Sequence, residues 1–213
     1  MKKAAIGVRA HSGWAAVLAV GEGAAKGRRG ANPEVLLRER VSVVEPHMAG
    51  ETSTRGIRGS SQPYHHVEGW KIPAAEKYLA ECLAIGVRMA TAALRRMAGE
   101  LRERGYSVAG CAVLAGSGRA MPELAKILAA HPLIHTAEGI FFRRVFQDAC
   151  EGLGWRVTAV REKELDAEAK RALGAGAAKA KRAIAGMGKI MGAPWTADQK
   201  MASLAAWMVI VGK

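Results

Sequence analysis

The stretch AAIGVRAHSGWAAVLAV, residues 4–20, points to the fold more clearly than any other part of this chain. Two runs of small and β-branched apolar residues flank the polar group His11-Ser12-Gly13, a pattern typical of two strands joined by a tight turn. The run VLLRERVSVVE at 35–45 alternates in its first half and predicts a third strand. We therefore expect the chain to begin with three strands connected by hairpins.

After this, helices alternate with strands. Apolar residues at steps of three and four predict an amphipathic helix from Pro73 to about Arg104, with Gly105 at its end. Apolar strands are predicted at 106–116 and 155–162. Further helical segments are predicted at 121–131, 135–154, 165–192 and from Thr196 to about Val211. Thr136 is the expected N-cap at 135–154, and Thr196 with Gln199 forms a capping-box pattern.

This order of elements predicts one α/β domain over residues 1–213, with a mixed β-sheet and helices on both faces. Residues 46–72 have no periodicity and are rich in Gly, Ser, Thr and Pro, so we expect an inserted loop there. Residues 174–195 are rich in Gly and basic, with no acid. We expect this segment to be mobile and to become ordered on binding a partner.

The composition is basic, with a net charge of +13 over 213 residues. A surplus of this size attracts polyanions, of which phosphate backbones are the commonest, although the same charge can serve solubility alone. Aromatic residues make up only 5%, which leaves little material for stacking on bases. The charge therefore favours a polyanionic partner held through phosphates.

Cysteine usage and hydropathy indicate the compartment. Cys82, Cys111 and Cys150 are odd in number and form no CxxC pair, which argues against a disulfide framework or a zinc knuckle. The late apolar run MASLAAWMVIVG is shorter than the ~20 residues that a membrane span needs. Arg9 interrupts any apolar core of a signal peptide. We expect a cytoplasmic protein with no membrane partner.

Three segments carry a resemblance to a known family: IGVRAHSGWAAV at 6–17, AEGIFFRRVFQDACEGLGWRVTAVREKEL at 137–165, and AAKAKRAIAGMGKIMGAPWTADQKMASLAAW at 177–207. Together they resemble the RNase H-like superfamily, and most of all the RuvC-type Holliday-junction resolvases. The resemblance implies an RNase H-like sheet and a nucleic-acid substrate. It also implies about four carboxylates around two divalent metal ions, which activate water and stabilise the leaving oxygen.

The chain departs from that family where the chemistry is expected. Arg9 stands where the resemblance assigns an acid to the first strand, and LAGSG at 114–118 stands where it assigns a Glu. In the last helix only Asp198 is acidic, with Lys200 and Ser203 in the neighbouring positions. Because a fixed positive charge at Arg9 repels metal ions, we expect the two-metal nuclease to have been lost.

Two other groups of residues have chemical potential. PYHHVEG at 63–69 carries His65 and His66, and HPLIHTAEG at 131–139 carries His131, His135 and Glu138. These side chains can ligate a transition metal or transfer protons, but a solvated loop and ordinary helix capping are the favoured explanations of the two groups. If they converge with His11 and Asp198, the relocated site is rich in histidine and suits Zn, Mn or Fe rather than Mg.

Three functions stay open. The leading hypothesis is a nucleic-acid-binding, RuvC-like protein without the two-metal nuclease, whose phosphate contacts are Arg9, Arg28, Arg29, Lys179, Lys181, Arg182 and Lys189. The second is a metal-assisted phosphodiester hydrolase with a relocated site, and only this hypothesis calls for a divalent metal. Its catalytic residues are His65, His66, His135, Glu138 and Asp198. The third is a non-enzymatic interaction protein, and a homodimer is compatible with all three.

Overall fold

The structure, a computed structural model, describes residues 1–23, 32–45, 61–116, 118 and 120–212. Five strands form one sheet in the order β3-β2-β1-β4-β5. The strands are β1 (Lys2–His11), β2 (Trp14–Glu22), β3 (Pro33–Ser42), β4 (Tyr106–Ala115) and β5 (Val157–Arg161). β2 pairs antiparallel with both β1 and β3, whereas β4 runs parallel to β1 and to β5. The predicted mixed sheet is confirmed.

The quoted stretch forms the predicted hairpin. Its register ends on the pair His11 and Trp14, so Ser12 and Gly13 make a two-residue turn. Gly13 has φ +79°, a left-handed conformation that glycine adopts without strain. The hairpin therefore follows from local sequence alone.

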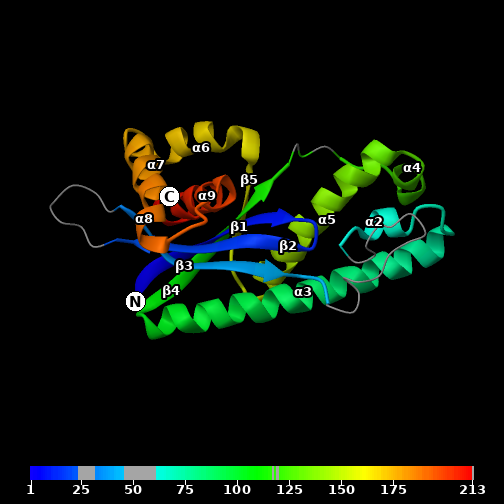
Figure 1. Cartoon of the computed structure of the whole chain (residues 1–213), viewed down its shortest axis with the longest axis horizontal. Helices are drawn as coiled ribbons and strands as arrows, with labels where there is room; N and C mark the ends of the chain where they lie inside the picture. Colours follow the sequence, from blue (N-terminus) through cyan, green and yellow to red (C-terminus); the bar gives the residue numbers. More distant parts are fainter. Residues whose placement is uncertain (24–31, 46–60, 117, 119, 213) are drawn as a thin grey trace.

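The helices cover both faces of the sheet (Figure 1). They are α2 (Pro63–His66), α3 (Ile72–Glu103), α4 (Leu124–Leu128), α5 (His131–Gly152), α6 (Leu165–Leu173), α7 (Gly176–Gly186), α8 (Gly188–Met191) and α9 (Ala197–Val211), with a short 3₁₀ helix at Glu162–Glu164. α3 and α5 lie on one face of the sheet, and α9 lies on the other, flanked by α6 and α7. This is the α/β fold class that the sequence predicts, a mixed sheet with helices on both faces.

Successive side chains along each strand point to opposite faces of the sheet. Ile6 and Val8 pack with Phe142 and Phe146 of α5, while Ala5 packs with α9. Gly7 also faces α9, which approaches so closely that a Cβ on Gly7 would lie 2.0 Å from the carbonyl oxygen of Ala202. The absence of a side chain at this position therefore allows α9 to dock on the middle of the sheet.

The boundaries of the helices confirm some predictions and correct one. Pro73 lies in the first turn of α3, Gly105 follows its end with φ +81°, and Thr196 and Gln199 form the capping box of α9. Thr136, however, is not an N-cap. α5 begins earlier, at His131, because Pro132 suits its first turn, and the Thr136 hydroxyl donates to the carbonyl of Pro132 at 3.0 Å.

The predicted loop contains a short helix, and the Gly-rich basic segment contains helices, as the helical prediction for 165–192 implies. Within the predicted loop 46–72, the structure has α2 at Pro63–His66, and residues 46–60 lie outside the described residues. Within 174–195 it has α7 and α8, of which α7 packs on α9. The mobility of the segment 174–195 stays a prediction.

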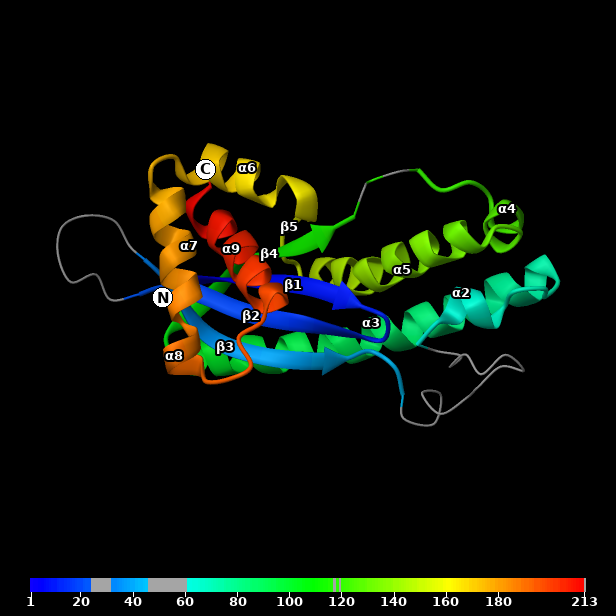
Figure 2. The ribbon, with the colours of Figure 1, turned by 45° about the horizontal axis from the view of Figure 1, so that its top comes forward.

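Different helices lie at the two ends of the sheet. α2, α4 and the first turns of α5 lie beyond one end of the sheet, whereas α7 and α8 lie at the other end (Figures 1 and 2). Cys82, Cys111 and Cys150 are buried and form no disulfide. Among the described residues, no helix combines the length and the apolar character needed to cross a membrane.

Candidate functional site

Arg9 lies near the carboxyl end of β1, at the sheet edge where the resemblance expects metal-binding acids. Its Nη2 donates to Oε2 of Glu162 at 3.0 Å, and its Nε lies 3.2 Å from Oδ1 of Asp198. The three side chains are between 19% and 26% exposed. One guanidinium thus holds two half-buried carboxylates that come from the segment after β5 and the first turn of α9.

His11 completes this group, which we call the Arg9 cluster (Arg9, His11, Glu162 and Asp198). The His11 Nε2 lies 2.9 Å from both Arg9 Nη1 and Asp198 Oδ2. In the neutral ring this nitrogen either accepts from the arginine or donates to the carboxylate. The ring also stacks on Trp14, with centroids 4.3 Å apart. Trp14 therefore covers one face of the His11 ring, and a ligand cannot reach the ring from that face.

The Arg9 cluster does not fit a two-metal site. Two divalent ions need several hard oxygen ligands, and both carboxylates of the cluster already face a guanidinium. A second arginine, Arg143, lies nearby. Burial lowers the pKa of Arg143, Glu162 raises it and Arg9 lowers it further. Its Nε is buried without a hydrogen-bond partner among the described residues. The edge is thus set up for anions or internal ion pairs rather than for metal ions.

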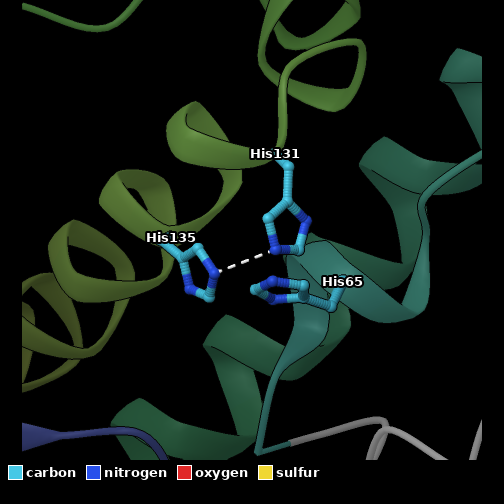
Figure 3. A group of neighbouring side chains, drawn as sticks. All are labelled: His65, His131 and His135. Atoms are coloured by element: carbon cyan, nitrogen blue, oxygen red, sulfur yellow. Dashed lines mark hydrogen bonds between the residues drawn. The ribbon is translucent and has the colours of Figure 1, made fainter.

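A second group of chemically active side chains lies where α2 meets the beginning of α5. His65, His131 and His135 converge there and point toward one another (Figure 3). One ring nitrogen of each lies within 4.8 Å of those of the other two, and Nε2 of His131 is 3.1 Å from Nε2 of His135. His65 is buried, whereas the other two are exposed. We call this group the histidine triad.

Glu138 supports the histidine triad from behind. Its Oε1 accepts from the backbone N–H of Tyr64 at 2.8 Å and of His65 at 3.2 Å, and it lies 3.2 Å from Nδ1 of His65. Burial raises the pKa of Glu138 to about 8, against the opposing effect of the two N–H donors. Burial also lowers the pKa of His65, as do His135 and His131. The carboxyl group thus ties α2 to α5.

The structure brings some of the candidate catalytic residues together and separates the others. His65, His135 and Glu138 do meet, joined by His131. His66, however, stacks on Tyr78 and lies against Trp70, and Asp198 belongs to the Arg9 cluster. Adjacent residues of α2 point to different sides of the helix, and α9 lies over the sheet while α2 lies beyond its end (Figures 1 and 2). The five predicted catalytic residues therefore divide between separate places.

The predicted phosphate contacts also differ in their surroundings. Arg9 is engaged in ion pairs, and Lys181 pairs with Asp166 at 2.8 Å. Lys179, Arg182 and Lys189 are exposed, on α7 and α8. Arg28 and Arg29 lie outside the described residues.

Two residues at this edge of the sheet, Glu162 and Arg143, are not among the candidates predicted from the sequence. Glu162 directly follows β5, and Arg143 sits in the middle of α5. A general rule points to the first of them, because side chains at the carboxyl ends of neighbouring parallel strands gather at one edge of the sheet. Nothing in the helical pattern of α5 marks Arg143, because its approach to the edge depends on how α5 crosses the sheet.

Comparisons with known proteins identify fold neighbours only. No protein-family model matches the chain, and no curated protein matches it in sequence. Among solved structures, the chain is similar to Thermus thermophilus RuvC, with 18% identity, 98% of this chain and 92% of that chain covered, and a TM-score of 0.46. It is also similar to T. thermophilus RuvC in complex with a Holliday junction substrate, with 14% identity, 97% and 91% covered, and a TM-score of 0.47.

Proposed function

We propose that this protein binds duplex or branched nucleic acid through phosphate contacts and that it has no two-metal nuclease at the sheet edge. The observation that carries the proposal is the Arg9 cluster. There a guanidinium, held by two carboxylates, supplies the positive charge that metal ions supply in enzymes of this fold. Such a protein can bind nucleic acid but lacks the metal ions that activate water for hydrolysis.

The exposed cations of α7 and α8 support the binding half of the proposal. α7 buries Ala177, Ala180 and Ile184 against the α9 side of the molecule. Lys179 and Arg182 lie on its exposed side, and Lys189 follows on α8. Residues 174–195 contain no acid. We call Lys179, Arg182 and Lys189 the ridge on α7 and α8. Exposed cations that contact phosphates release counterions, and this release is the main source of non-specific affinity for a duplex.

Other arginines serve the fold and are poor candidates for phosphate contacts. Arg88 and Arg96 of α3, and Arg104 directly after its end, pair with acidic side chains. Arg38 of β3 donates to the carbonyls of Met191, Gly192 and Pro194 and so anchors the segment after α8. Arg182 and Lys189 of the ridge are exposed and therefore better placed to contact phosphates.

The experiment is a salt titration of binding, followed by fluorescence anisotropy with a labelled duplex and a labelled four-way junction. For the wild type, affinity should fall by orders of magnitude between about 50 and 200 mM salt. The double variant Arg182→Glu/Lys189→Glu should weaken binding at low salt by at least about tenfold and lower the slope of log K against log salt by about 2.

A matched control separates local contacts from net charge. Lys77→Glu/Arg95→Glu makes the same change in charge on the exposed side of α3 and should leave most of the affinity and the slope intact. Equal weakening by both double variants would show a general charge effect, and failure of the wild type to bind at low salt would favour the interaction-protein hypothesis. Cleavage in Mg²⁺ that depends on Asp198 or Glu162 would contradict the loss of the nuclease.

A further inference from the structure

The histidine triad has the spacing of metal ligands. Around a tetrahedral Zn²⁺ ion with Zn–N bonds of about 2.0–2.1 Å, two ligand nitrogens lie about 3.3 Å apart. Nε2 of His131 and Nε2 of His135 are already 3.1 Å apart. The nitrogen that His65 offers lies within 4.8 Å of both, so each of these distances has to shorten by at most about 1.5 Å. Side-chain rotation alone can supply this movement.

The two helical ligands share one face of α5. His131 and His135 are four residues apart, which places them one above the other in the first turns of the helix. Two histidines at this spacing on one helix are a recurring arrangement in zinc sites. Both side chains are exposed, so an ion from solvent can reach them.

Glu138 selects the form of His65 that a metal needs. Its Oε1 lies 3.2 Å from Nδ1 of His65 and already accepts from the backbone N–H groups of Tyr64 and His65, so this oxygen is an acceptor and the ring proton belongs on Nδ1. The lone pair is then on Nε2, which is available to a metal ion. A ligating histidine that donates its other N–H to a carboxylate is the usual outer-sphere arrangement of zinc sites.

We propose that His65, His131 and His135 bind one Zn²⁺ ion, which joins α2 to α5 and keeps a fourth coordination position for water. Three imidazoles suit zinc and other transition metals and disfavour Mg²⁺ and Ca²⁺, which prefer oxygen. The open fourth position follows because His131 and His135 face solvent and the structure places no fourth ligand among the described residues. This site is independent of the nucleic-acid binding proposed above.

The test is a calorimetric titration of the full-length, EDTA-treated protein with ZnCl₂, together with thermal unfolding with and without zinc. We expect one equivalent of Zn²⁺ per chain with a Kd below about 1 µM, and a higher Tm in zinc because only the folded chain assembles the site. Single variants His131→Ala and His135→Ala should lose at least about 100-fold in affinity. Both residues are exposed, so the folded state should persist.

His66→Ala is the matched control, because His66 is the neighbour of a ligand but stacks on Tyr78 instead. It should bind zinc like the wild type. The Co²⁺-loaded wild type should show the intense visible absorption of a four-coordinate site, and His135→Ala should not. The proposal is overturned if the wild type binds no zinc, if His131→Ala and His135→Ala bind as tightly as the wild type, or if His66→Ala loses as much affinity as they do.

Discussion

Replacement of Arg9 tests whether a guanidinium stands in for metal ions at the sheet edge. Arg9→Met keeps much of the length of the side chain but leaves Asp198 and Glu162 without their shared cation. Removing one partner of a fully buried pair costs about 3–5 kcal/mol, and of an exposed pair about 0.2–1 kcal/mol. These side chains are 19% to 26% exposed, between the two limits.

For the two ion pairs together, we expect Arg9→Met to lower the free energy of unfolding by about 2–3 kcal/mol. For a chain of this length, that corresponds to a drop in Tm of roughly 4–12 °C. Urea denaturation followed by circular dichroism measures the free energy, and a thermal scan measures the Tm.

Arg9→Asp extends the same test. A third carboxylate beside Asp198 and Glu162 adds repulsion, so this variant should be less stable than Arg9→Met in EDTA. Millimolar Mn²⁺ should then restore part of its stability, because three carboxylates bind a hard cation. Mn²⁺ should not stabilise the wild type by binding at this edge of the sheet, since Arg9 already supplies the positive charge.

Two results would refute this reasoning. If Arg9→Met has the same free energy of unfolding as the wild type, the ion pairs contribute nothing to the stability of the fold. An equal rise in Tm with Mn²⁺ in the wild type and in Arg9→Asp, measured in the His135→Ala background to remove the histidine triad, would mean that Arg9 does not take the place of a cation.

Three further predictions concern the fold. Gly7→Ala should cost about 3 kcal/mol or more in unfolding free energy, because the new Cβ meets the backbone oxygen of Ala202; near-normal stability in urea would show that α9 docks less closely. Gly99→Ala, inside α3 with no atom within 4 Å of the new Cβ, should instead add up to about 1 kcal/mol, and a loss would argue against the helix there. Thr196→Ala removes the capping-box acceptor for the N–H of Gln199 and should cost about 1 kcal/mol; an unchanged urea midpoint would contradict the cap.

Local sequence determined most of the elements and the presence of Arg9 near the carboxyl end of β1. The hairpin at 4–20, the first turn of α3 at Pro73 and the capping box at Thr196 depend on residues within a few positions of one another, so pattern and propensity predict them. That Arg9 stands where the resemblance assigns an acid is likewise visible without a structure. The start of α5 was misjudged because Thr136 and Pro132 both carry start signals, and the proline prevailed.

Only the tertiary structure decided which side chains meet. Arg9 contacts Asp198 and Glu162 because β1, β5 and α9 come together at one edge, and His65 meets His131 and His135 because α2 packs against α5. Such contacts join residues far apart in the chain, and they depend on crossing angles and on close approaches such as that at Gly7. Sequence periodicity specifies which face of an element is buried but not where along a neighbour it lies, so the candidate residues could be named from the sequence while their grouping into two sites could not.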